Sequence, residues 1–214
     1  MTPAELRTIT HSTLRVLADS RRLEDIIIVG NIVARPRMEH LAAELRRTRE
    51  GSALLDERPE MTTRNVDLDG LRRLAPETLG RTFVDHLDRH GLDLDALSTP
   101  PPDPGDPDHV YLLRRVRGNH DLWHALLGMG IAGHEEVLVH AFTYGQLRIP
   151  HSLMIMVFGG MKHLLLERRW RLLSRELRRY LDAGRRAVPL LTVRWEEQWE
   201  VPLARIRESY RLPS

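Results

Sequence analysis

The chain contains no cysteine, and this single absence excludes several kinds of chemistry. It can form no disulfide, offers no thiolate nucleophile and cannot build a cysteine-ligated zinc site, so any bound metal must be held by His, Asp and Glu. Small secreted domains that depend on disulfides are excluded as well. The simplest expectation is therefore a cytoplasmic protein.

Long apolar runs and a strong excess of one charge are also missing. The longest apolar run, residues 153–158, is far shorter than the ~20 residues that span a bilayer, and no N-terminal stretch resembles a signal peptide. Only Lys162 is a lysine among 32 basic residues, which nearly balance 30 acidic ones. A net charge of +2 gives no reason to expect a nucleic-acid partner. We expect a protein that is cytoplasmic or lies peripherally on the inner face of a membrane.

Helical periodicity is present through most of the sequence. Residues 25–33 are rich in β-branched side chains, but we assign them to a helix because their surroundings are helical. We expect an all-α fold in which residues 1–214 form a single mostly helical domain, with residues 1–50 supplying its N-terminal helices. A chain of this length can bury a full core.

Capping residues and prolines give approximate bounds for the helices. Thr2-Pro3-Ala4-Glu5 and Asp106-Pro107 are typical of helix starts, and Gly91 of a helix end. A helix end is expected at Gly51, after which residues 54–59 lead into an extended connection through Thr62 to Val66, and a proline-rich loop is expected over residues 99–107. Helices are predicted over residues 3–17, 25–33, 38–49, 67–74, 76–90, 107–126, 136–146 and 150–182, with a tail over 188–212 that breaks at Pro202.

The residues that carry chemistry gather in residues 120–136, HDLWHALLGMGIAGHEE. His120, Asp121 and His124 fall within about one helical turn because a helix repeats every ~3.6 residues. Glu136 follows a turn rich in glycine. Two imidazoles and two carboxylates that can converge are natural ligands of a divalent transition metal, so the motif predicts a metal site between its helix and the following helix. Asp121 is either a ligand or a partner that orients an imidazole N–H, since adjacent helical residues point ~100° apart.

The spacing His-Asp-x-x-His, eleven residues and then Glu is the hallmark of the ubiquinone (coenzyme Q) biosynthesis family usually called Coq-four. This chain resembles that family over most of its length from about residue 50 onward. Other matching stretches are Glu57-Arg58-Pro59, Val66-Asp67-Leu68 with Leu71, Leu79-Gly80-Arg81, Tyr111 through Arg117, Gly184-Arg185-Arg186-Ala187, and Glu197-Gln198-Trp199 through Leu203 and Arg207. One position departs from the pattern, because the family commonly has glycine where this chain has Glu135.

The resemblance implies a metal-dependent enzyme of ubiquinone biosynthesis. Its reaction would be an oxidative decarboxylation that replaces a carboxyl by a hydroxyl at ring carbon C1 of a prenylated aromatic acid. The metal ligands would be His120, Asp121, His124 and Glu136, and the same four residues would be catalytic, with Glu135 as an auxiliary acid or base. Zinc is favoured by the resemblance. Fe(II) is the second choice, because two histidines and a carboxylate also serve non-haem iron, and redox-inert zinc cannot accept electrons.

Several further expectations concern partners. The ligand would be a hydrophobic aromatic or prenylated small molecule, and we expect a homodimer that contacts a membrane peripherally and meets other biosynthetic enzymes. Two other functions stay open: a family member recruited to tailor a polyketide-type secondary metabolite, and a lipid-binding scaffold for quinone-biosynthetic enzymes whose metal only holds the fold. The identity of the substrate, and the effect of metal removal on folding, would distinguish these functions.

The apolar run and the arginines near the C-terminus each have a structural interpretation as well as a functional one, and the remaining histidines have structural interpretations. The apolar run 153–158 could line a channel for a prenyl tail or pack in the core. The arginines from Arg168 to Arg186 could meet anionic phospholipid or form a solvated helix face. His134 is read as a turn residue, His140, His151 and His163 as core or rim residues, and His11, His40, His86, His90 and His109 as surface residues.

Overall fold

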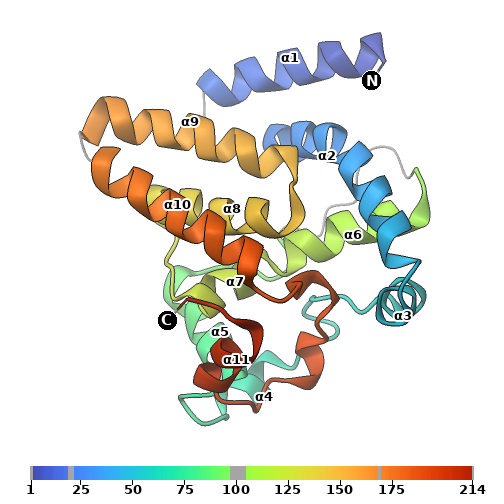
Figure 1. Cartoon of the computed structure of the whole chain (residues 1–214), viewed down its shortest axis with the longest axis vertical. Coiled ribbons are helices and arrows are strands. Elements are labelled where there is room, and N and C mark those ends of the chain that lie inside the picture. Colours follow the sequence, from blue (N-terminus) through green and yellow to red (C-terminus); the bar gives the residue numbers. More distant parts are fainter. Residues whose placement is uncertain (1, 19–21, 97–104, 168–169, 214) are drawn as a thin grey trace.

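The computed structural model of the chain describes residues 2–18, 22–96, 105–167 and 170–213. Within these ranges the architecture is helical, and an isolated bridge between Thr78 and Pro202 is the only β-type pairing, which confirms the all-α fold (Figure 1). The helices are α1 (Pro3–Ala18), α2 (Leu23–Leu45), α3 (Arg49–Glu57), α4 (Leu68–Arg72), α5 (Leu79–His90), α6 (Pro107–Gly118), α7 (His120–Leu127), α8 (Gly133–Leu147), α9 (Pro150–Glu167), α10 (Trp170–Arg186), η1 (Leu190–Thr192), η2 (Trp195–Glu197) and α11 (Leu203–Tyr210).

Helix α8 lies in the core. It buries side chains around much of its circumference, among them Val139 and Phe142, which is typical of a core helix. Helices α9 and α10 both pack against it, and Figure 1 shows the three side by side. An added Cβ would stand 2.5 Å from a backbone oxygen of α10 at Gly145 and 2.2 Å from one of α8 at Gly184. These two glycines let α8 and α10 approach backbone to backbone.

Helix α2 is longer than the sequence predicts. It joins the two helices expected over residues 25–33 and 38–49 and continues through Pro36, which removes one backbone hydrogen bond. Pro36 is exposed, while Ala34 and Met38 on either side of it are buried. Burial of the apolar face therefore offsets the local cost of proline.

Helix α3 lies where the sequence predicts a helix end at Gly51 and a non-helical lead into the extended connection. Its start is set by Thr48, whose hydroxyl accepts a hydrogen bond from the Gly51 amide at 3.1 Å. Leu54 and Leu55 are buried on its inner face. Gly51, read as a helix end, lies inside α3, where an added Cβ would stand 2.5 Å from the Leu45 carbonyl oxygen.

The helix predicted over residues 107–126 is divided at Asn119. Asp106 caps α6 as expected, since its carboxylate accepts from the Asp108 amide, but α6 ends at Gly118 and α7 begins at His120. This division places the two histidines of the motif on a short helix of their own, which packs against α5.

The predicted helix 150–182 corresponds to two helices, α9 and α10, each of which packs on α8. Leu153 and Val157 on α9 are exposed, whereas Met156 packs against the core, so the apolar run is only partly a core element. On α10 the acidic residues are interleaved as ion pairs, such as Arg179 with Glu176 at 3.4 Å. His163, Arg168 and residues 99–104 of the predicted loop lie outside the residues whose side chains or backbone the structure describes.

A buried arginine ties the C-terminal segment to α6. The Arg115 side chain donates hydrogen bonds to the carbonyl oxygens of Leu191, Val193 and Pro59 at 2.9, 2.6 and 2.8 Å, and also meets Glu196. Its side chain is 1% exposed.

None of the described helices combines the length and the apolar character that crossing a bilayer requires.

Candidate metal centre

Helices α7 and α8 bring the motif residues together. His120 and His124 lie one turn apart on α7, so both imidazoles project from the same face. Glu136 lies in the first turn of α8. Between the helices Gly128 adopts a φ of 67°, in the left-handed region that favours glycine, and ends α7. The turn therefore returns the glutamate to the face of α7 that carries the histidines.

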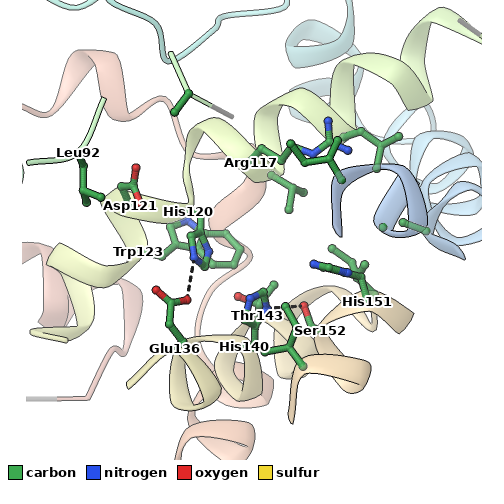
Figure 2. Close-up of a pocket in the computed structure, with 18 of the residues that line it drawn as sticks. Leu92, Arg117, His120, Asp121, Trp123, Glu136, His140, Thr143, His151 and Ser152 are labelled. Carbon is green, nitrogen blue, oxygen red and sulfur yellow. Dashed lines mark hydrogen bonds and ion pairs between the residues drawn. The ribbon is translucent and has the colours of Figure 1, made fainter. Parts of the chain in front are cut away.

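Three ligand atoms converge on one point. The Nε2 atoms of His120 and His124 are 3.2 Å apart, and oxygens of the Glu136 carboxylate lie 3.3 Å from the first and 3.4 Å from the second. Figure 2 shows the contact between His120 and Glu136. A tetrahedral ion with bonds of ~2.05 Å keeps its ligand atoms ~3.3 Å apart. The two imidazole nitrogens, and each nitrogen and the carboxylate oxygen that faces it, are thus separated by about the distance between ligand atoms around such an ion.

A hydrogen bond fixes which nitrogen of His124 faces this point. Its Nδ1–H donates to the carbonyl oxygen of Gly130 at 2.8 Å, because a carbonyl can only accept. The Nε2 atom therefore faces the other two ligands. The ring is fully buried and stacks on His86 with centroids 5.6 Å apart. Such outer partners orient a ligating imidazole and hold its tautomer.

Charge and burial act in opposite directions on His120 and Glu136. Burial lowers the pKa of His120, but the hydrogen bond and charge of Glu136 outweigh it, so the pKa is raised. Burial also acts to raise the pKa of Glu136, but hydrogen bonds with His120 and His124 hold it well below its usual range. The pair therefore favours a carboxylate beside a cation, and a divalent metal can take the place of the proton.

Two of the three residues, His120 and Glu136, form part of the wall of a cavity of about 380 Å³, and His124 lies buried behind this wall. This volume is at the lower end of the ~300–1,000 Å³ of small-molecule pockets, enough for an aromatic ring with short substituents. Figure 2 shows His120 and Glu136 on one side and Arg117 and His151 on the other. The lining comprises Ile27, Gly30, Ala34, Leu92, Asp93, Ala96, Leu113, Val116, Arg117, His120, Asp121, Trp123, Glu136, His140, Thr143, Ile149, His151, Ser152 and Ile155.

Asp121 lines the cavity but stands outside the three-residue group. Figure 2 shows its carboxylate on the side of the cavity where Leu92 lies, apart from that of Glu136. Burial raises the pKa of its carboxyl. The structure thus brings together three of the four predicted ligands, with Asp121 facing the space that a substrate would fill.

Comparison with known proteins places this geometry in a family. The model of the family described as coenzyme Q (ubiquinone) biosynthesis protein Coq4 matches residues 3–214. The chain belongs to the Coq4 family. This family takes part in ubiquinone biosynthesis, as the resemblance of the motif implied.

Individual relatives agree with this assignment. The ubiquinone biosynthesis protein COQ4 of Yarrowia lipolytica is 32% identical, over 88% of this chain and 72% of its own length. The homologue of Aedes aegypti is 29% identical, over 94% of this chain and 73% of its own length. A crystal structure of a candidate ubiquinone biosynthesis protein from Nostoc punctiforme superposes with a TM-score of 0.76 at 25% identity, and covers 97% of this chain and 98% of that one.

The relatives correct one expectation. The Coq4 proteins of Aedes aegypti, Yarrowia lipolytica and Bos taurus are named as mitochondrial, which contradicts the cytoplasmic location. A lack of cysteine excludes dependence on disulfides, but it does not distinguish one reducing compartment from another.

Glu135, the departure from the Coq4 pattern, is held by the turn between α7 and α8. Its carboxylate accepts hydrogen bonds from the amides of Gly130 at 2.9 Å and Ala132 at 3.1 Å. An added Cβ at Gly130 would stand 2.8 Å from a carboxylate oxygen of Glu135. Glu135 is not among the residues that line the cavity. The structure thus shows a capping role for Glu135, and its role as an auxiliary base stays a prediction.

Several histidines lie in different surroundings from those that the sequence predicts. His86 and His109, predicted on the surface, are 5% and 1% exposed. His86 stacks on the ligand ring of His124, and its place three residues after the buried Phe83 was a signal for the inner face of α5. His140 and His151, read as core or rim residues, line the cavity.

Proposed function

We propose that this Coq4 protein is a metal-dependent enzyme that replaces the C1 carboxyl of a prenylated aromatic acid with a hydroxyl. The observation that carries the proposal is the convergence of His120, His124 and Glu136 at a mostly apolar cavity, which His120 and Glu136 line. The cavity size suits the aromatic head group of such an acid rather than a complete polyprenyl tail. The names of the Coq4 relatives support the pathway.

The metal would be held by His120, His124 and Glu136, which leaves at least one coordination position for a ligand. Zinc is the first choice and Fe(II) the second, because the donor set serves both ions. When bound, such an ion supplies Lewis-acid polarisation of a substrate oxygen. Asp121, whose pKa is raised by burial, holds or releases a proton at the substrate from the cavity wall.

The reaction balances with dioxygen and an external reductant. The bond between C1 and the carboxyl carbon breaks and releases carbon dioxide, while a bond forms between C1 and one oxygen atom of dioxygen. The other oxygen atom leaves as water after it takes up two electrons and two protons. The metal ligands themselves undergo no net change.

Turnover of a 3-prenyl-4-hydroxybenzoate under air with a reductant tests the proposal, with mass spectrometry of the product and metal analysis of the protein. His124→Ala and Glu136→Gln should lose both bound metal and product, whereas Asp121→Asn should keep the metal and lose most product. His40→Ala is a matched control, since that side chain is 65% exposed on α2. Full turnover by His124→Ala would refute the proposal.

The scaffold function is a second candidate, because the fully buried His124 links α7 to α8 through Glu136. If chelation unfolds the protein and no turnover is found in the wild type, the metal is structural. Peripheral membrane contact is also a proposal, supported by exposed Leu153 and Val157 on α9. The expected homodimer and the contacts with other biosynthetic enzymes stay predictions.

A further inference from the structure

The cavity has a second polar wall that the metal centre does not use. Arg117 comes from the last turn of α6, and His151 and Ser152 come from the first turn of α9. His140 on α8 completes this wall, with its Nδ1 atom 3.2 Å from the Ser152 hydroxyl. Figure 2 shows Arg117 and His151 across the cavity from Glu136.

The position of His151 is fixed from two sides. Its ring packs edge-on against His140 with centroids 5.7 Å apart. On the other side it faces Gly30 in α2, where an added Cβ would stand 3.2 Å from Nδ1 of His151. A glycine inside a helix is destabilising relative to alanine. At position 30 the absence of a side chain leaves room for the His151 imidazole at the cavity wall.

Arg117 gives the second wall its charge. Burial lowers the pKa of Arg117 to about 10, which still leaves the guanidinium charged at neutral pH. Burial and the nearby Arg117 charge lower the pKa of His151 to about 4, so this imidazole is neutral and can donate or accept a hydrogen bond. The other ionisable groups on the cavity are His140, Asp93, which is exposed, Asp121 and the metal-centre pair.

The Arg117 guanidinium is half-buried. A guanidinium is the group that proteins use for carboxylates and other planar oxygen anions, because its fork of N–H donors matches their geometry. The opposite wall carries a centre suited to a cation that binds oxygen. A ligand that fills both walls has oxygen substituents at opposite ends of a flat, apolar body.

We propose that Arg117 and His151 form an anion subsite that binds an ionised oxygen substituent of the aromatic ligand, at the end of the ring away from the metal centre. The aromatic class of the ligand rests on the proposed function. The anion is either the ring carboxylate or an ionised phenol. Arg117 and His151 are then residues that select and orient the ligand, whereas the metal centre carries the chemistry.

Calorimetric titration of small aromatic probes measures the subsite directly, in metal-loaded and in chelator-treated protein. The probes are 4-methoxybenzoate, methyl 4-hydroxybenzoate above the pKa of its phenol, and the uncharged methyl 4-methoxybenzoate. Arg117→Gln should weaken binding of one or both anions by about 10- to 100-fold and leave the neutral ester unchanged. Arg117→Lys should recover part of the affinity. The anion that loses affinity identifies the source of the charge.

Arg114→Gln is the matched control, because Arg114 lies on the same helix, pairs with Glu60 and is absent from the cavity lining. Gly30→Ala provides a second variant that improves helix propensity while its methyl group displaces His151, and it should weaken anion binding as well. Equal losses for the neutral ester and the anions, or affinities unchanged in both Arg117→Gln and Gly30→Ala, would overturn the proposal.

The chelator-treated arm separates this inference from the proposed function. If the proposed reaction is wrong but the subsite exists, binding of the anions still depends on Arg117 in metal-free protein. If the subsite is wrong but the reaction is right, turnover depends on His124 while Arg117→Gln binds every probe as the wild type does.

Discussion

Replacement of Glu135 by glycine should weaken metal binding although Glu135 is not a ligand. The reason is a chain of contacts that ends at the metal centre. The Glu135 carboxylate holds the Gly130 amide at 2.9 Å, and the Gly130 carbonyl accepts the Nδ1–H of His124 at 2.8 Å. The Nε2 atom of the same imidazole is one of the three converging ligand atoms. Loss of the carboxylate frees the turn and with it the direction of the ring.

The magnitude follows from the number of steps. Loss of a group that directly orients a ligating imidazole lowers metal affinity by ~10- to 100-fold. Glu135 acts one hydrogen bond further away, so we expect the lower end of that range, about tenfold or ~1.4 kcal/mol. Glu135→Gln keeps one acceptor oxygen for the two amides and should show a smaller loss.

Competition with a chromogenic zinc chelator measures the affinity of each variant, with Glu39→Gln on the exposed face of α2 as the control. Wild-type affinity in Glu135→Gly would show that the turn needs no carboxylate, and would refute this reasoning. A different failure is equally informative: if Glu135→Gln binds zinc normally but loses turnover, the carboxylate acts on the substrate as a base.

Other parts of the structure give further predictions. The unfolded chain takes up a proton at His151 near pH 6.5 but the folded protein only near 4, so the free energy of unfolding of metal-free protein should fall by ~1–3 kcal/mol as pH drops from 6.5 to 4. His151→Phe should show a shallower decline in urea titrations, and an equal decline would contradict the assignment. Arg115→Met should cost ~3 kcal/mol of unfolding free energy, because it leaves buried carbonyl oxygens without a donor, whereas Arg114→Met should cost less than ~1 kcal/mol in the same assay. Gly184→Ala should lower the thermal midpoint by at least several degrees, since its Cβ would overlap the Phe142 carbonyl oxygen, and an unchanged midpoint would show that α10 can shift away from α8.

The metal centre could be predicted from the sequence because its ligands are local. His120 and His124 share a helix face by spacing alone, and Glu136 follows after a glycine-rich turn. The break at Asn119 was missed although Gly118-Asn119 is a plausible helix end, because apolar spacing continues across it. Thr48 is a typical helix-capping residue and indicates the start of α3, but Gly51 favours the prediction of a helix end.

The second wall of the cavity could not be predicted in the same way. Gly30, Arg117, His140 and His151 come from four helices, and no spacing rule joins positions so far apart in the chain. Their meeting depends on how α2, α6, α8 and α9 pack. In the sequence, Arg117 is one of several arginines on a basic helix. Only its position at the cavity, partly shielded from solvent, distinguishes it from the others.

At the junction between α6 and α7, the number of residues affects the geometry of the cavity as much as their identity does. Arg117 ends one helix with a side chain at the anion subsite, and His120 begins the next with a side chain at the metal centre. One residue corresponds to ~100° of rotation on a helix. A deletion of Asn119 would keep every ligand and every cavity residue, yet it would turn the two walls relative to each other. The distance between the proposed metal site and the proposed anion subsite thus depends on the number of residues between Arg117 and His120, which a scan of substitutions does not test.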